Sequence, residues 1–185
     1  MTTAASLPRL RLVTLADAPA IAAIYGRAVL TGCASFEIDP PDAAEMAARI
    51  AKIVDAGHPW LVAELDGAVV GYAYAGPYRP RPAYRHTVED SIYVAEEAQG
   101  RGLGRWLLAA LISAEEARGA RQMIAVIGDS ANTGSIGLHA ALGFRHAGVF
   151  TSVGYKHGRW LDSVLMQRAL GPGDETAPDA PPTAR

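Results

Sequence analysis

The chain has 185 residues and a formal net charge of −2; half of its residues are hydrophobic and 19% are charged. This length suits one domain with a full core, and the charged fraction argues against a disordered or coiled-coil protein. No block of Lys and Arg stands out, and no apolar run approaches the roughly 20 residues that span a bilayer. We therefore expect neither nucleic acid nor a membrane as a partner. No cluster of Cys, His, Asp and Glu has metal-site spacing, so no metal is expected.

The first sixty residues show helical periodicity after one short strand. Asp17 and Asp42 stand where side chains cap helices, and Pro19 fits a first helical turn, where a missing N–H has no effect. A single cysteine, Cys33, favours the reducing cytoplasm, and no secretory signal is recognisable. The expected elements are a loose leader at 1–8, a strand at 10–13, a helix after Asp17, a loop at 32–41, and a helix from Asp42 to before Gly57 with Met46, Ile50, Ile53 and Val54 as its buried stripe.

From Trp60 onward the pattern changes to strands. Asp66-Gly67 between two apolar runs is a strong hairpin signal. The tail at 171–185 is Pro-rich and poor in apolar residues, which predicts disorder. Hairpins and strand–helix–strand units together predict an α/β (α+β) domain over 9–170 with a mixed sheet. The expected elements are strands at 60–64 and 69–75, a loop at 78–86, a strand at 87–94, a helix at 102–118, a strand at 123–127, a helix at 132–142, and strands at 146–151 and 162–168.

The most specific motif is Gln99-Gly100-Arg101-Gly102-Leu103-Gly104, between an expected strand and an expected helix. Glycines let the backbone approach a ligand closely, and the unpaired N–H groups of a helix start bind phosphate oxygens. Arg101 and Arg105 add positive charge. The motif lacks the Gly-Lys-Ser/Thr ending of a P-loop and the later acidic residue of a dinucleotide fold. The alternative is a turn that binds no ligand.

Gln99-x-x-Gly102-x-Gly104 resembles the acyl-CoA pyrophosphate loop of the GNAT acetyltransferase superfamily, and the segment from Asn132 to Phe144 falls in that family's order. Three stretches are similar to its phosphinothricin and methionine-sulfoximine acetyltransferase branch: Thr31–Glu37, Thr87–Val94 and Gly154–Asp162. The resemblance covers nearly all of 10–170. It implies the GNAT fold, in which a central, mixed, mostly antiparallel sheet is splayed in the middle and flanked by helices. It also implies acetyl-CoA as co-substrate and a homodimer.

The resemblance also implies roles for individual residues. Glu89 matches the glutamate held to be the general base, because an amine must lose a proton before it attacks a thioester. The alternative makes Glu89 an edge-strand residue paired with a nearby arginine. Expected cofactor contacts are Ile92, Tyr93, Val94, Gly100, Arg101, Gly102, Leu103, Gly104, Arg105, Asn132 and Ser135. For Asn132, capping the following helix is an equally good explanation.

His139 stands where many GNAT enzymes have a tyrosine that protonates the departing thiolate. It is interpreted as that acid, as a substrate contact, or as an ordinary helix histidine bonded to a backbone carbonyl. Guanidinium groups suit the carboxylate of an amino-acid substrate, although a solvated basic loop is the alternative for the Arg-rich segment. The expected substrate contacts are Phe36, Arg79, Arg81 and Tyr84, mainly Arg81 and Tyr84. Trp160 and Asp162 are expected to position the last strands.

The sequence thus predicts an N-acetyltransferase that moves acetyl from acetyl-CoA to a small amino-acid-like amine of the phosphinothricin or methionine sulfoximine type. Direct transfer is expected, because Cys33 is predicted to be a buried spare thiol far from the Gly-rich loop. Two alternatives stay open. One is the same fold acting on another amine, such as a protein N-terminus or a polyamine, although a polyamine would need an acidic pocket. The other is a non-catalytic acetyl-CoA-binding module.

Overall fold

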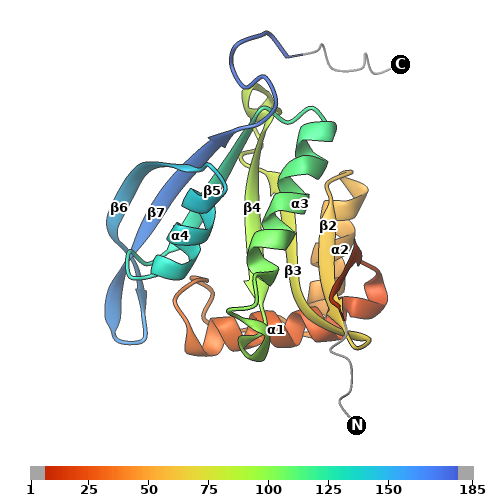
Figure 1. Ribbon diagram of the computed structural model, residues 1–185. Helices are drawn as coiled ribbons and strands as arrows, with labels where there is room; N and C mark the ends of the chain where they lie inside the picture. The colour runs from red at the N-terminus through yellow and green to blue at the C-terminus, as the bar shows by residue number, and fades with distance from the viewer. Residues whose placement is uncertain (1–6, 179–185) are drawn as a thin grey trace.

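The computed structural model describes residues 7–178, which form one seven-stranded sheet with helices on both faces (Figure 1). The elements in chain order are β1 (Arg9–Leu12), α1 (Ala18–Thr31), α2 (Ala43–Asp55), β2 (Trp60–Leu65), β3 (Ala68–Pro77), β4 (Thr87–Val94), α3 (Leu103–Ala117), β5 (Gln122–Gly128), α4 (Thr133–Ala141), β6 (Arg145–Lys156) and β7 (Arg159–Ala169). Short 3₁₀ turns occupy Leu15–Asp17, Pro82–Tyr84 and Glu96–Ala98.

The sheet has the order β1-β2-β3-β4-β5-β7-β6. Within the described residues, β4 and β5 form the parallel pair and the other neighbours are antiparallel. The parallel ladder is short, since pairing runs from Thr87–Gln122 to Asp90–Ala125 and then stops. Beyond that point the two strands diverge. The predicted mixed sheet with a central splay is confirmed.

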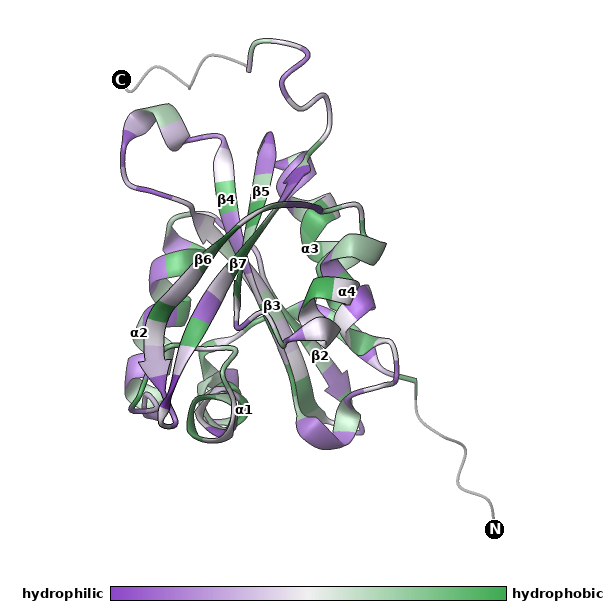
Figure 2. Ribbon diagram, turned by 90° about the vertical axis from the view of Figure 1, so that its left-hand side faces the viewer, coloured by the Kyte–Doolittle hydropathy of each residue, from purple (hydrophilic) through white to green (hydrophobic). Residues whose placement is uncertain are grey.

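Helices α1 and α2 cover one face of the sheet, and α3 and α4 cover the other (Figure 2). Each layer closes over its own apolar cluster. Under α3 the cluster includes Leu107, Leu108, Leu111, Met123 and Met166. Under α1 and α2 it includes Ile21, Val29, Ile50, Trp60 and Tyr72. β4 therefore lies between two packed layers in the middle of the sheet, and the splay opens beside it.

Two helix-level predictions need correction. Asp42 does cap α2, because its side chain accepts from the Glu45 N–H at 2.8 Å. Asp17 precedes α1 but makes no capping bond; its carboxylate bonds Arg11 and the Thr14 N–H, each at 2.8 Å. An ion pair with β1 therefore replaces the cap. Val54, predicted as part of the buried stripe, is 45% exposed at the end of α2.

The C-terminal strands are longer than predicted. β6 and β7 form a hairpin of 12 and 11 residues, and β6 carries two bulges that break its alternation. The predicted disorder from residue 171 is corrected for 171–178: this segment forms turns that Arg121 holds by hydrogen bonds to the Gly173 and Ala177 carbonyls. The predicted leader falls largely, and the rest of the predicted tail wholly, outside the described residues. Within residues 7–178 no helix has the length and apolar character needed to cross a bilayer.

Candidate active site

The Gly-rich motif forms a cradle, Gly100–Arg105, at the start of α3. Gly100 and Gly102 adopt φ values of +71° and +80°, and Gly102 is the N-cap of α3. A Cβ on either glycine would meet nothing within 4 Å, so the N–H groups at the helix start face open space. Arg101 and Arg105 are exposed beside them. A cavity of about 390 Å³ at the cradle is lined by the predicted residues Ile92, Tyr93, Val94, Gly100, Gly102, Leu103, Gly104, Asn132 and Ser135.

The splay lies directly beside the cradle. A small cavity of about 50 Å³ separates Ser91–Tyr93 of β4 from Ala125–Gly128 of β5. Asn132 borders it and also caps α4, because its side chain accepts from the Ser135 N–H at 3.2 Å. The capping interpretation of Asn132 is therefore confirmed. Backbone groups of β4 that lack a partner on β5 are free to bind an extended ligand at this point.

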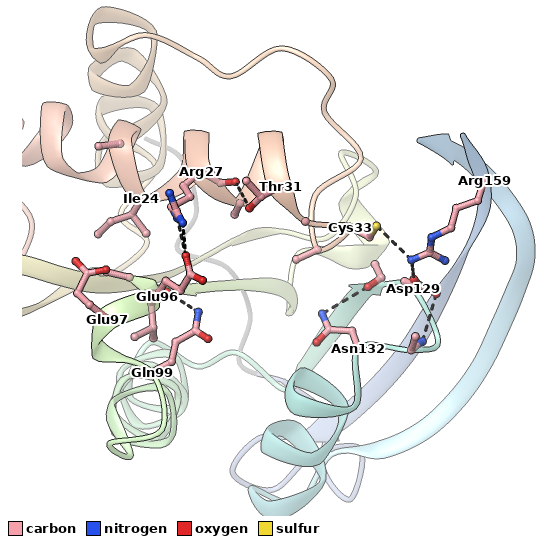
Figure 3. A pocket seen from close by; sticks show the side chains of 18 residues that line it. Ile24, Arg27, Thr31, Cys33, Glu96, Glu97, Gln99, Asp129, Asn132 and Arg159 are labelled. Carbon is pink, nitrogen blue, oxygen red and sulfur yellow. Dashed lines mark hydrogen bonds and ion pairs between the residues drawn. The ribbon is translucent and has the colours of Figure 1, made fainter. Parts of the chain in front are cut away.

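A hollow of about 680 Å³ lies beside the ends of β4 and β5 and shares Val94, Gln99 and Asn132 with the cavity at the cradle (Figure 3). Arg27 of α1 and Glu96 pair across one rim at 2.6 Å. On the opposite side Arg159 contacts Asp129 and lies 3.4 Å from the Cys33 sulfur. Cys33 is partly exposed and lines the same hollow as Gln99. The prediction that Cys33 is buried is wrong.

On the α1 and α2 face of the sheet, a further cavity of about 370 Å³ is lined by Arg79, which is exposed. We call it the Arg79 pocket. It brings together the predicted residues Phe36, Arg79 and Glu89. Arg79 stacks over the ring of Tyr78 with its guanidinium carbon 5.0 Å from the ring centre. The remaining lining is mostly apolar and comes from Tyr78, Val126, Phe150, Val153, Ser163 and Leu165.

Glu89 is half-buried on β4, which is a central strand and not an edge strand. Within the described part of the chain its carboxylate forms no ion pair, so the alternative of an arginine-paired edge residue is not what the structure shows. Burial raises the pKa of Glu89, and the negative charge of Asp90 raises it further, while Arg79 lowers it. The net result is a carboxylate with more affinity for a proton than an exposed one.

His139 projects from α4 into the splay from the other face. Its Nδ1 lies 2.7 Å from the Ser135 carbonyl and its Nε2 lies 3.0 Å from Asp90 Oδ2. Both side chains are 2% exposed, and the other Asp90 oxygen is buried without a partner. Burial lowers the pKa of His139, but the Asp90 carboxylate and the Ser135 carbonyl raise it, and the net pKa is above the usual value. The interpretation of His139 as a helix histidine bonded to a backbone carbonyl is thus correct for Nδ1. The other ring nitrogen, Nε2, contacts the buried Asp90 carboxylate.

Arg81 and Tyr84, the favoured substrate contacts, do not line the Arg79 pocket. Arg81 is exposed and precedes the 3₁₀ turn, and Tyr84 packs edge-on against Tyr78 with ring centres 5.6 Å apart. The β6–β7 hairpin contributes four residues to the pocket that were not predicted from the sequence: Phe150, Val153, Ser163 and Leu165. The available signal for these residues was the presence of two large apolar side chains, Phe150 and Val153, within four positions of one exposed strand.

The last strands are positioned by Asp162 as predicted, through backbone bonding. It accepts from the Ser152 N–H at 2.9 Å and from the Ser130 hydroxyl at 2.6 Å. Trp160 is 63% exposed and contacts Tyr155 edge-on, so it does not anchor the strands in the core. Among residues 7–178, no three His, Cys, Asp or Glu side chains converge to hold a metal ion.

Comparison with known proteins gives the family. Residues 29–144 match the acetyltransferase (GNAT) family. The chain is 60% identical over 169 residues to phosphinothricin N-acetyltransferase of Alcaligenes faecalis, covering 91% of this chain and 86% of that protein. This chain belongs to the GNAT acetyltransferase family.

Two further relatives agree. An L-methionine sulfoximine/L-methionine sulfone acetyltransferase of Pseudomonas paraeruginosa is 45% identical over 159 residues, covering 85% of this chain and 92% of that protein. The crystal structure of a phosphinothricin acetyltransferase from Sinorhizobium meliloti in complex with acetyl-CoA superposes with a TM-score of 0.90 at 50% identity, covering 93% of each chain. The protein is an acetyl-CoA-dependent N-acetyltransferase.

The residues of this acetyltransferase fit acetyl-CoA. The two left-handed glycines leave open space where a pyrophosphate would need close approach to the N–H groups of α3. The cavity at the cradle continues toward the splay, because Ile92, Tyr93 and Asn132 line both. A long, flexible arm can therefore extend from the cradle to the point where β4 and β5 part.

Proposed function

We propose that this enzyme acetylates the α-amino group of an amino acid of the phosphinothricin or methionine sulfoximine type. The observation that carries the proposal is the Arg79 pocket, which places a guanidinium, a half-buried carboxylate and an apolar wall around one cavity next to the splay. Arg79 suits the substrate carboxylate, Glu89 suits its amine, and the apolar wall suits a side chain that ends in a methyl group. The names of the relatives point to the same acceptors.

In this proposal the two faces of the sheet have separate tasks. The cradle and the backbone of Ile92, Tyr93 and Val94 hold acetyl-CoA, which supplies the thioester-bound acetyl group. The acceptor lies in the Arg79 pocket on the opposite face. Glu89 takes a proton from the ammonium group, directly or through water, so that the amine can attack. Transfer is direct, and Cys33 carries no acyl group, since Arg159 holds it across the hollow from β4.

His139 is the proposed acid for the departing thiolate. Although burial lowers its pKa, the hydrogen bond to the Asp90 carboxylate raises the pKa of His139 above the usual value, which favours the protonated ring, and His139 borders the splay. Arg81 and Tyr84 stay proposed substrate contacts of the exposed loop that follows β3. We also propose a homodimer, supported by the exposed apolar residues of the β6–β7 hairpin, and a cytoplasmic location, supported by a single cysteine without a disulfide partner.

A thiol-release assay tests the acceptor class. The panel is phosphinothricin, methionine sulfoximine, methionine sulfone, methionine, a peptide with a free N-terminus, and spermidine, each with acetyl-CoA. We expect the highest kcat/KM among the first three. A higher kcat/KM on the peptide or on spermidine would assign the enzyme to another acceptor, and the absence of thiol release with every amine would overturn the proposal.

Arg79 and Arg81 provide a matched pair for the carboxylate contact. Loss of a charge-assisted hydrogen bond costs about 1.5–3 kcal/mol, so Arg79→Ala should raise the acceptor KM about tenfold or more and leave the acetyl-CoA KM unchanged. Arg81→Ala should have a smaller effect, because Arg81 lies outside the pocket. A larger effect from Arg81→Ala would show that the loop, and not Arg79, carries the main carboxylate contact.

A further inference from the structure

The ring of Phe36 rests on the backbone of β6 at Gly154. A Cβ built on Gly154 would lie 2.5 Å from Cε2 and 2.7 Å from Cδ2 of Phe36, which is closer than side chains tolerate. Gly154 is not among the residues with positive φ, so its backbone conformation is open to any amino acid. Glycine is therefore required at position 154 because it has no side chain, and not because of its backbone angle. Gly154 leaves the room that the ring fills.

The residues on either side of Phe36 are anchored by hydrogen bonds. The Ser35 carbonyl accepts from the buried Lys156 Nζ at 2.8 Å, and the Ser35 hydroxyl bonds the Tyr25 hydroxyl at 2.8 Å. On the other side, the Glu37 side-chain carboxylate accepts from Arg49 Nη1 at 2.8 Å, and the Glu37 N–H donates to the Ser35 hydroxyl at 3.2 Å. Because Ser35 and Glu37 are both held, the chain around Phe36 cannot move away from β6. A methyl group at position 154 would instead turn the ring toward the Arg79 pocket.

The strand that supports the ring is itself shaped around the pocket. Phe150 pairs with Ser163 and Gly154 with Leu161, so Thr151, Ser152 and Val153 stand opposite Asp162 alone. Ser152 has a φ of +54°, and Asp162 holds its N–H. This bulge lets both Phe150 and Val153 line the pocket, although they are three positions apart on one strand.

We infer that Gly154 determines acceptor specificity: by leaving the ring of Phe36 against β6, it sets the depth of the Arg79 pocket and admits an amino acid with a long side chain. This inference rests on the proposed function, in which the Arg79 pocket holds the acceptor. Gly154 touches neither the acceptor nor the reacting atoms; it is a positioning residue that acts through Phe36.

The test compares Gly154→Ala with Gly148→Ala. Gly148 also lies on β6, and a Cβ there would meet nothing within 4 Å. A ring turned into the Arg79 pocket occupies space that the acceptor side chain needs, so the Gly154→Ala protein should show an acceptor KM for methionine sulfone raised about tenfold, which corresponds to about 1.4 kcal/mol. Its acetyl-CoA KM should stay within about twofold of the parent value, and Gly148→Ala should match the parent for both substrates. Calorimetric titration of methionine sulfone in the presence of CoA should show the same loss of affinity.

A third protein shows whether the effect passes through Phe36. In a Phe36→Leu background the smaller side chain vacates the space, so adding Gly154→Ala should no longer raise the KM. This double variant should also fold if the single Gly154→Ala protein does not. A parent-like KM in Gly154→Ala, or an equal rise in both backgrounds, would overturn the inference while the proposed function stands. A parent without activity on any amino acid would overturn the proposed function, and this inference with it.

Discussion

Glu89 and Asp90 show how adjacent residues of one strand acquire different chemistry. Successive side chains of a strand point to opposite faces, so Glu89 enters the Arg79 pocket and Asp90 enters the layer under α4. Asp90 is held by His139 and stays buried as a structural and electrostatic partner. Its charge raises the pKa of Glu89, after the larger effect of burial. The pair of carboxylates thus makes Glu89 a stronger base without placing a second acid in the pocket.

Replacing Glu89 by glutamine tests this role. The substitution keeps size and hydrogen bonding but removes proton affinity, and a positioned general base contributes about 10²–10⁴-fold, so kcat should fall within that range. In the parent, kcat/KM should rise with pH through a limb set by the Glu89 pKa, which lies above the usual glutamate value. In the variant that limb should disappear, and the rate should rise at alkaline pH, where the free amine needs no base. The measurement is kcat/KM against pH for the parent and for Glu89→Gln, with methionine sulfone as the acceptor.

Glu64→Gln is the control for Glu89→Gln, because Glu64 lies on β2, is ion-paired with Arg11 at 2.8 Å and is far from the pocket. Its kcat should equal that of the parent. An unchanged kcat and profile in Glu89→Gln would make Glu89 structural and leave deprotonation to solvent or another residue. If His139 is the acid, an alkaline limb of the parent profile should be lost in His139→Gln, and its survival there would exclude His139.

At the level of elements, prediction from sequence succeeded where a signal is local. β4 has the predicted bounds, and α3 begins one residue after the predicted start, because a Gly-rich turn marks the passage from strand to helix. The ends of β6 could not be predicted. Its two bulges shift the register, so apolar residues do not recur every second position and the expected alternation is broken. Asp17 was misread for a related reason: its partner Arg11 lies on another element.

The cradle is formed by the turn that begins α3. Gly67 in the β2–β3 turn provides a matched control for Gly102 of the cradle. Gly102 and Gly67 share a φ of +80°, and a Cβ on either meets nothing within 4 Å. Alanine in a left-handed conformation costs about 1–2 kcal/mol, so Gly102→Ala and Gly67→Ala should lose similar stability in thermal unfolding. Only Gly102→Ala should raise the acetyl-CoA KM, because its methyl group occupies space beside the N–H groups of α3.

Direct titration of CoA by calorimetry separates binding from turnover for these two proteins. A Gly102→Val protein should bind CoA still more weakly than Gly102→Ala, since a larger side chain fills more of the cradle. If folded Gly102→Val binds CoA as well as the parent does, the cradle is not the pyrophosphate site. If Gly67→Ala loses affinity to the same extent, the effect belongs to overall stability and the assignment is equally wrong.

Across the whole molecule, the two parts of the site differ in how well they can be predicted from the sequence. The cradle can be predicted, whereas the Arg79 pocket consists of residues that only the fold brings together. The cradle is contiguous in sequence, so its motif was sufficient to place most of its residues. The Arg79 pocket draws on the loop before α2, the loop after β3, the first half of β4, the middle of β5 and the β6–β7 hairpin. Phe150, Val153 and Leu165 join it through a strand register set by bulges. No local pattern reports such a register.

The β6–β7 hairpin also presents an apolar surface on the outside of the molecule. Val149, Phe150, Val153, Tyr155 and Trp160 are between 38% and 63% exposed. β6 is an edge strand, and its unpaired backbone groups are a second route to association. Exposed apolar patches mark interaction sites, and a two-fold dimer covers such a patch with the same patch of a second copy. It supports the proposed homodimer and identifies the hairpin as the surface to test.

Trp160→Glu should therefore convert the proposed dimer into a monomer. Trp160 is 63% exposed and packs edge-on against Tyr155, so a carboxylate there can stay solvated in the monomer but would have to be desolvated in an interface. Leu12→Glu is the control, because Leu12 is 67% exposed on β1, the edge strand at the other end of the sheet. Sedimentation velocity of the parent and both variants, with circular dichroism to verify folding, gives the answer. A monomeric parent would remove the dimer from the proposal. A dimer that survives Trp160→Glu but dissociates in Leu12→Glu would move the interface to β1.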